Sequence, residues 1–204
     1  MIDFDSIMSI SSSDIEGAAK ALDKSDIPEL VEWLALKDDA VRYKAFLLLQ
    51  SRSESLNDVY PFWDVFREKL RSENSYQRSI GLMLIAENVR WDTGNRMEEI
   101  TGDYLALLKD EKPITVRQCV QSLEKIVLKK TNLSDVIASA LITFDVMAVK
   151  ETMRKSILTD ILNVLLLIRK EYKTDATESF IITALSGEIL DKKTKKQIEG
   201  VWRS

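Results

Sequence analysis

Apolar residues recur along most of the chain at the spacing of an α-helix, in segments separated by polar and helix-capping residues. After Pro28, for example, an apolar face at helical spacing ends at Asp38, and a second such face begins at Val41. No segment shows sustained period-two alternation between hairpin turn residues. The pattern therefore predicts about eleven helices and no sheet.

The predicted helices fall into pairs. Ser13 and Glu16 form a capping box that predicts a first helix running to about Lys24. The next helix starts near Asp26, with Pro28 in its first turn, and precedes a partner at 41–50. The later pairs are expected at 60–71 with 76–90, 95–109 with 116–130, 135–149 with 151–173, and 176–187 with 192–203.

These pairs share a repeated pattern. A basic residue opens the second helix of each, and successive basic residues are 36, 39, 37 and 41 positions apart, at Arg42, Arg78, Arg117, Arg154 and Lys195. A residue suited to close helix packing follows three places later in four pairs, at Ala45, Gly81, Val120 and Ile157. A two-helix unit of about 40 residues is typical of an α-solenoid.

Two of the pairs carry a more specific resemblance. Leu107, Asp110, Pro113, Val116 and Arg117, followed by Val120, Leu123 and Ile126, resemble a HEAT repeat. Asp38, Val41, Arg42, Ala45 and Leu48 resemble the same pattern in the first pair. The similarity spans roughly Pro28 to Arg169, and the second pair departs from it, with Gln77 where valine is expected.

The resemblance implies a right-handed solenoid of about five stacked antiparallel helix pairs with an N-terminal capping helix. We expect one domain over 1–204, with an N-terminal cap at 1–25, helical repeats at 26–173 and a divergent C-terminal cap at 174–204. In HEAT repeats, acids of the turns and the basic residues after them form ladders along the solenoid. The ladder positions implied here are Asp38 or Asp39, Arg42, Asp110, Arg117 and Arg154.

Composition limits the chemistry. The chain has no histidine, which excludes Ser-His-Asp and Cys-His catalysis and most zinc sites. Its one cysteine, Cys119, allows no internal disulfide and is expected to be an inert thiol. The N-terminus has no basic leader, and the longest apolar stretch, at 161–168, is too short to cross a bilayer. We therefore expect a cytoplasmic protein with no membrane association, no metal and no cofactor.

The candidate binding residues are of two kinds. Trp63 lies in a crowded aromatic turn and Trp91 at a helix end, where either could be an exposed anchor for a partner. If the second helices line a concave groove, the exposed positions on it include Arg78, Gln121, Arg154 and Asp160. The alternative for the repeated arginines is pairing with nearby turn acids, which we consider the better interpretation.

Three functions remain open. The first is a non-enzymatic module that binds a protein or peptide on its concave face. The second is a DNA alkylation-repair enzyme of the alkylpurine glycosylase type, or a DNA-binding protein, because bacterial alkylpurine DNA glycosylases also have a HEAT-like solenoid; the net charge of −4 disfavours nucleic acid. The third is an acidic inhibitor of the immunity type, which fits the charge without a supporting motif. The sequence does not predict the oligomeric state.

Overall fold

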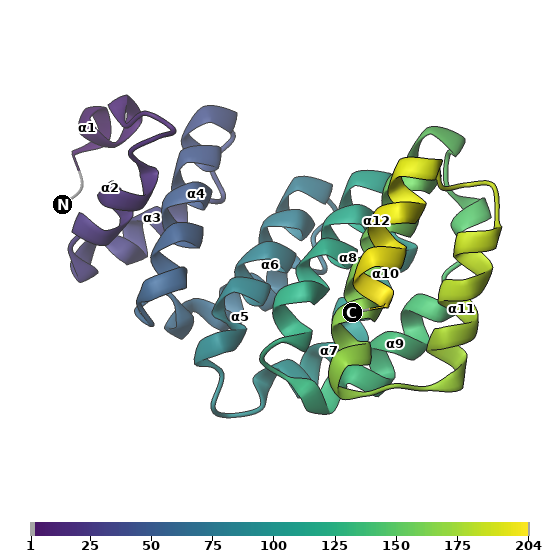
Figure 1. The fold of residues 1–204 in the computed structure, drawn as a ribbon. Coiled ribbons are helices and arrows are strands. Elements are labelled where there is room, and N and C mark those ends of the chain that lie inside the picture. The colour runs from purple at the N-terminus through teal and green to yellow at the C-terminus, as the bar shows by residue number, and fades with distance from the viewer. Residues whose placement is uncertain (1–2, 204) are drawn as a thin grey trace. The chain divides into compact units, whose positions relative to one another are not determined.

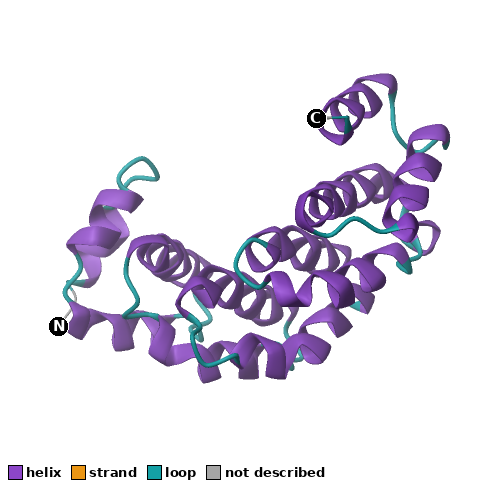
Figure 2. Ribbon diagram, turned by 60° about the horizontal axis from the view of Figure 1, so that its bottom comes forward, coloured by secondary structure: helices purple, strands orange, loops and turns teal. Residues whose placement is uncertain are grey.

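The computed structural model describes residues 3–203, and this range contains α-helices, short 3₁₀ helices and loops but no strand (Figures 1 and 2). The predicted all-α class is confirmed. The α-helices are α1 (Phe4–Ser9), α2 (Ile15–Ala21), α3 (Ile27–Trp33), α4 (Asp39–Ser55), α5 (Trp63–Lys69), α6 (Ser75–Asn88), α7 (Arg96–Ala106), α8 (Pro113–Val127), α9 (Ser134–Ile142), α10 (Glu151–Glu171), α11 (Asp175–Ser186) and α12 (Lys192–Trp202).

The second helix of each predicted pair is present close to its expected bounds, whereas most of the first helices are shorter than expected. Short 3₁₀ turns border several of them, for example Tyr60–Phe62 before α5 and Leu107–Lys109 after α7. The segment expected as one helix over 135–149 consists of α9, a turn and the 3₁₀ helix Val146–Ala148. The first helices are therefore the less regular half of each pair.

The N-terminal region differs from the sequence prediction. Helix α1 was not predicted, and Phe4 from it packs edge-to-face on Trp33 with ring centroids 5.2 Å apart. The predicted capping box at Ser13 does not form, because the N-cap of α2 is Asp14, which makes no side-chain cap bond. The Ser13 hydroxyl instead donates to the Asp14 carboxylate at 3.4 Å.

Residue contacts divide the chain into two compact units, Met1–Ile100 and Thr101–Ser204, and the division falls inside α7. The sequence predicts one domain with internal boundaries at residues 25 and 173. That expectation stays a prediction, because dividing the contacts does not test whether the two groups of helices fold together.

In the first unit, α4 is the central element: α2, α3 and α6 all pack on it, and α5 packs on α6. Trp63 and Phe66 of α5 are fully buried in this core, together with Leu48 and Leu49 of α4 and Leu84 of α6. A buried ion pair adds a polar link, since Arg52 contacts Asp58 at 2.6 Å. The Arg52 guanidinium also donates to the carbonyl oxygens of Ala19, Lys20 and Leu22 and so holds the C-terminal end of α2 against α4.

Gly81 lies where α6 passes closest to α5. A β carbon at this position would be 2.7 Å from the Phe66 carbonyl oxygen and 3.0 Å from the Lys69 β carbon. The residues expected at close-packing positions, Ala45, Gly81, Val120 and Ile157, are all buried, as predicted. The close approach at Gly81 is to α5, the first helix of its own pair.

In the second unit, α8 and α10 pack side by side, and α9 and α12 also contact α10. Their shared core is aliphatic, with Val120 and Leu123 of α8 and Ile161 and Leu165 of α10 fully buried. Two long-range polar contacts reinforce it. The Arg117 Nε donates to Asp160 at 2.8 Å, and Lys155 of α10 pairs with Asp191, the N-cap of α12.

The repeated basic residues all occur near the start of a second helix, as the spacing predicted. Three of the arginines reach back to backbone carbonyls of the preceding turn. Arg42 Nη1 donates to Leu36 at 2.8 Å, Arg78 Nη1 to Ser72 at 2.8 Å, and Arg154 Nη2 to Met147 at 3.0 Å. Each of these guanidinium groups therefore stabilises the turn that joins the two helices of its own pair.

None of the helices described over 3–203 is long and apolar enough to cross a membrane.

Candidate functional site

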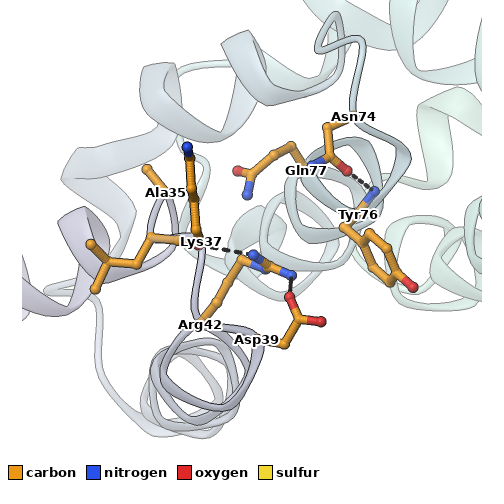
Figure 3. A pocket seen from close by; sticks show the side chains of 8 residues that line it. Ala35, Lys37, Asp39, Arg42, Asn74, Tyr76 and Gln77 are labelled. Atoms are coloured by element: carbon orange, nitrogen blue, oxygen red, sulfur yellow. Dashed lines mark hydrogen bonds and ion pairs between the residues drawn. The ribbon is translucent and has the colours of Figure 1, made fainter.

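The first unit contains a pocket of about 470 Å³ between the N-terminal ends of α4 and α6 (Figure 3). Its lining comes from the turn before α4, from α4 itself and from the start of α6, and consists of Ala35, Leu36, Lys37, Asp39, Arg42, Asn74, Tyr76 and Gln77. We take this pocket as the candidate site and call it the α4–α6 pocket.

Two capping residues place the walls of the pocket. Asp38 ends the turn after α3, and its Oδ1 accepts hydrogen bonds from the backbone N–H groups of Ala40 at 2.9 Å and Val41 at 3.1 Å. Asn74 has the same role for α6 and accepts from the Tyr76 N–H at 2.9 Å. Because these caps fix where the helices begin, Arg42 and Gln77 both fall in a first turn and face the same space.

Arg42 provides the fixed positive charge of the pocket. The residue is only 9% exposed, and its guanidinium donates to the Leu36 carbonyl at 2.8 Å and pairs with Asp39. The guanidinium carbon also lies 5.6 Å from the centre of the Tyr76 ring, which is within the range of a cation–π contact. These contacts hold the charge at the bottom of the pocket with little freedom.

A hydrogen-bonded chain forms a second wall. Lys69 of α5 donates to the Gln77 side-chain oxygen, and the Gln77 amide in turn donates to the Leu34 carbonyl at 2.7 Å. Burial lowers the pKa of Lys69, and the positive charge of Arg42 lowers it further. The charge of Arg42 therefore also affects Lys69, which does not line the pocket itself.

Several other polar side-chain groups around the pocket have no hydrogen-bond or ion-pair partner among the described residues. Lys37 is exposed, and its ammonium has no ion pair or hydrogen bond among the described residues. Tyr76 is 65% exposed, and no residue in the described range pairs with its hydroxyl. The Asn74 side chain uses its oxygen as the helix cap and leaves its amide N–H groups unpaired within residues 3–203. The pocket thus offers hydrogen-bond donors to a ligand.

Several residues predicted as exposed binding positions are buried instead. Trp63 is 1% exposed and belongs to the core, and Asp160 is 8% exposed because it accepts from Arg117 and, at 3.1 Å, from Gln121. Arg78 is 9% exposed and bonds to the turn carbonyls. The expected exposure of these three side chains is therefore wrong.

The remaining predicted positions are partly accessible. Arg154 is half-buried, Gln121 is exposed, and Trp91 is half-buried with its indole N–H donating to the Ser53 carbonyl at 2.8 Å. These residues do not belong to the α4–α6 pocket. The two aromatic candidates thus act mainly in packing and hydrogen bonding within the first unit.

The residues predicted for the ladder make several different contacts. Asp38 caps its own helix, and Arg42 pairs with Asp39 within α4. Asp110 accepts from the Lys112 N–H at 2.8 Å in its own turn. Arg117 does reach the following pair of helices, but its partner there is Asp160 of α10.

Sequence reasoning did not select Lys37, Asn74, Tyr76 or Gln77 as site residues. One signal was available, since Gln77 was already noted as a departure from the HEAT-like pattern at a position where valine is expected. In the structure this substitution adds an amide that connects Lys69 to the Leu34 carbonyl. A polar residue at an expected core position was therefore the best clue to the pocket.

A larger pocket of about 700 Å³ lies in the second unit and is mainly apolar. Leu105, Leu108, Val116 and Phe144 contribute to its lining, together with Lys109, Asp110 and Asp145 at its polar positions. Cys119 lies nearby in the core, where burial raises the pKa of its thiol well above the ordinary value and the Asp110 carboxylate adds to this effect. The second pocket lacks the surplus of donors found in the α4–α6 pocket.

Over residues 3–203, no cluster of three or more carboxylate or cysteine side chains is arranged to hold a metal ion.

With this geometry established, we compared the chain with known proteins. No protein-family model, curated protein or solved structure matches it significantly. The resemblance to HEAT repeats therefore stays a prediction, and the function has to be argued from the site itself.

Proposed function

We propose that this protein is a non-enzymatic interaction module, a HEAT-like stack of helix pairs that binds a protein or peptide partner. A binding module requires no catalytic group; the one cysteine of the chain is buried, and the chain has no histidine. A cytoplasmic location belongs to the same proposal.

Regular contacts between successive pairs support the stacked architecture. Gln77 of the second pair bonds to Leu34 of the first, and Arg117 of the third pair bonds to Asp160 of the fourth. At the other end of α4, the Asn88 side chain donates to the Ser53 hydroxyl at 3.0 Å. Bonds between residues roughly one repeat apart are those that a solenoid needs to hold its units in register.

The observation that carries the binding function is the combination of a rigid basic pocket with an exposed apolar rim. Arg42 is buried and fixed, while Tyr76 is 65% exposed and Leu36 43% exposed beside it. Tyrosine and arginine are enriched at protein interfaces, because each offers a large contact area together with a polar group. Here both types meet at one pocket and are held by the caps of α4 and α6.

A selection experiment tests this function. The full chain would be used to select peptides from a randomised displayed library, and the recovered peptides would be titrated against wild type and Tyr76→Ala. We expect micromolar binding that weakens by about tenfold or more in the variant, as for a central interface residue. Tyr172→Ala provides a matched tyrosine control in the second unit, where Tyr172 is 43% exposed, and should leave binding unchanged.

Failure of the selection to enrich any binding peptide would contradict the proposal. Salt-sensitive binding of duplex DNA in place of peptide binding would also contradict it, and would support the DNA-binding alternative.

A further inference from the structure

The α4–α6 pocket is positively charged in a chain whose net charge is negative. Two cations, Lys37 and Arg42, contribute to its lining and are opposed there by one carboxylate, that of Asp39. The net charge of the whole chain is −4, so this pocket has the opposite sign to the protein as a whole. A fixed guanidinium and an unpaired ammonium in one pocket favour an anionic ligand.

The unpaired groups around the pocket are mainly donors. The Lys37 ammonium and the Asn74 amide N–H groups have no partner among the described residues, and the Tyr76 hydroxyl can also donate. Asp38 and Asn74 already accept hydrogen bonds from backbone N–H groups at the starts of α4 and α6. The donors that the pocket offers to a ligand are therefore side-chain groups and not the helix ends.

The one carboxylate in the pocket is weakly held. The side chain of Asp39 is 82% exposed, whereas that of Arg42 is 11% exposed. An ion pair with one partner this exposed is screened by water and salt and contributes little. A ligand carboxylate can therefore take the place of Asp39 on the guanidinium while Arg42 keeps its bond to the Leu36 carbonyl.

We propose that the α4–α6 pocket binds an acidic side chain of the partner peptide, with Lys37 and Arg42 contacting its carboxylate and Asp39 acting as an internal competitor. This inference rests on the proposed function as a peptide-binding module. At about 470 Å³ the pocket exceeds a single carboxylate, and the exposed parts of Leu36 and Tyr76 fit an apolar residue next to the acid.

The choice of a peptide over a nucleic acid follows from the charge distribution. Strong binding to duplex DNA requires several basic groups aligned to neutralise successive phosphates. The described lining of this pocket contains two cations, and one of them is already paired with Asp39. A single ligand carboxylate matches the charges of these two cations, and an apolar residue beside it matches the exposed apolar lining.

The test compares a selected peptide with a twin in which every Asp or Glu is replaced by Asn or Gln. On the wild-type chain we expect the amide twin to bind about three- to tenfold more weakly, the range of a partly exposed charge contact. On Lys37→Met the difference between the two peptides should shrink, since the free ammonium is gone, but a part should remain because Arg42 still contacts the carboxylate. Lys24→Met, which also removes an exposed lysine of the first unit, should keep the wild-type difference.

A second variant tests the competitor. Asp39→Asn should strengthen binding of the acidic peptide about twofold or more, whereas Asp5→Asn should not, although both remove one negative charge from the first unit. Arg42 is not replaced, because it also bonds to the Leu36 carbonyl and its loss could unfold the turn.

The outcomes separate the two proposals. Recovery of no binding peptide would overturn the proposed function. If the recovered peptides bind the wild-type chain no more tightly than their amide twins do, the acidic subsite is overturned while the binding module stands. The same holds if the acidic peptide binds Lys37→Met as tightly as it binds the wild type. Stronger binding to the wild type than to Asp39→Asn would also overturn the competitor role.

Discussion

Gly81 of α6 lies so close to Phe66 of α5 that a β carbon added to it would be 2.7 Å from the Phe66 carbonyl oxygen. The distance is shorter than a carbon atom can tolerate against backbone oxygen, so the glycine is required by packing. The same position was selected from the sequence because it follows Arg78 by three residues, the place of a close-packing residue in four of the pairs.

Gly81→Ala should therefore lower the free energy of unfolding by about 1–3 kcal/mol, as expected for overpacking of a tight contact. The matched control is Gly102→Ala in α7, where an added β carbon meets nothing within 4 Å. That variant should raise stability by up to about 1 kcal/mol through helix propensity alone. Chemical denaturation of both variants gives the measurement, and a Gly81→Ala protein that is more stable than wild type would contradict the packing.

The buried Arg52–Asp58 pair should be essential for holding α2 on α4. Their side chains are 6% and 9% exposed, and Arg52 also satisfies three carbonyls near the end of α2. Arg52→Met leaves a buried carboxylate without its partner, which should cost about 3–5 kcal/mol. Lys20→Met, which breaks an exposed pair with Glu16, is the control and should change stability little. Equal unfolding free energies for the two variants would contradict this role.

Cys119 should be unreactive in the folded protein. The residue is fully buried, its Sγ lies 3.5 Å from the Tyr104 carbonyl oxygen, and burial raises the pKa of its thiol. Since the thiolate is the reactive form, a thiol reagent should label the chain only as fast as it unfolds. Labelling measured at rising denaturant concentration should track unfolding, and rapid labelling of the native protein would show that the thiol is accessible.

Glu124 should weaken the fold at neutral pH. Its pKa is raised by burial, and the Asp160 carboxylate raises it further. Above the raised pKa the half-buried carboxylate of Glu124 carries an unfavourable charge, whereas below the ordinary pKa the group is neutral in both the folded and the unfolded state. Glu124→Gln should therefore stabilise the protein at neutral pH, and the gain should disappear as the pH falls through the raised pKa to below the ordinary value.

Denaturation at several pH values measures this effect, with Glu188→Gln at an exposed position as the control. A gain for Glu124→Gln that stays constant down to low pH would mean that the charge of Glu124 is not its cause.

The helices were the most predictable part of the structure, because each second helix carries both a periodic apolar face and a local start signal. Asn74 and Asp191 are N-caps that bond within their own first turns, and such local interactions can be read from neighbouring residues. The position of Arg78 near the start of α6 follows from the same register.

The partners of the repeated arginines could not be predicted in this way. Arg78 and Arg117 have similar places in their helices, yet the first bonds to the Ser72 carbonyl of its own turn and the second to Asp160 of the next pair. Which acceptor is within reach depends on tertiary packing. The exposure of Trp63 was wrong because the burial of an aromatic turn also depends on tertiary packing, and here Trp63 lies in the core of the first unit.

The complete α4–α6 pocket likewise could not be predicted from the sequence. Its lining joins residues 35–42 to residues 74–77, and no local pattern indicates that these two turns lie side by side. Only the polar residue Gln77 at an expected apolar position gave a signal. Pockets between repeats arise from how the units pack, which the sequence of each unit does not specify alone.

Binding of a peptide at the α4–α6 pocket can be located by mapping backbone amide chemical shifts by NMR. The full chain would be titrated with the best peptide from the selection, with Lys37, Asn74, Tyr76 and Gln77 as the reporting residues. We expect the largest shifts at these four amides and small shifts around the second pocket at Leu105 and Phe144. Saturable shifts confined to other residues, with these four amides unchanged, would show that the peptide binds elsewhere on the chain.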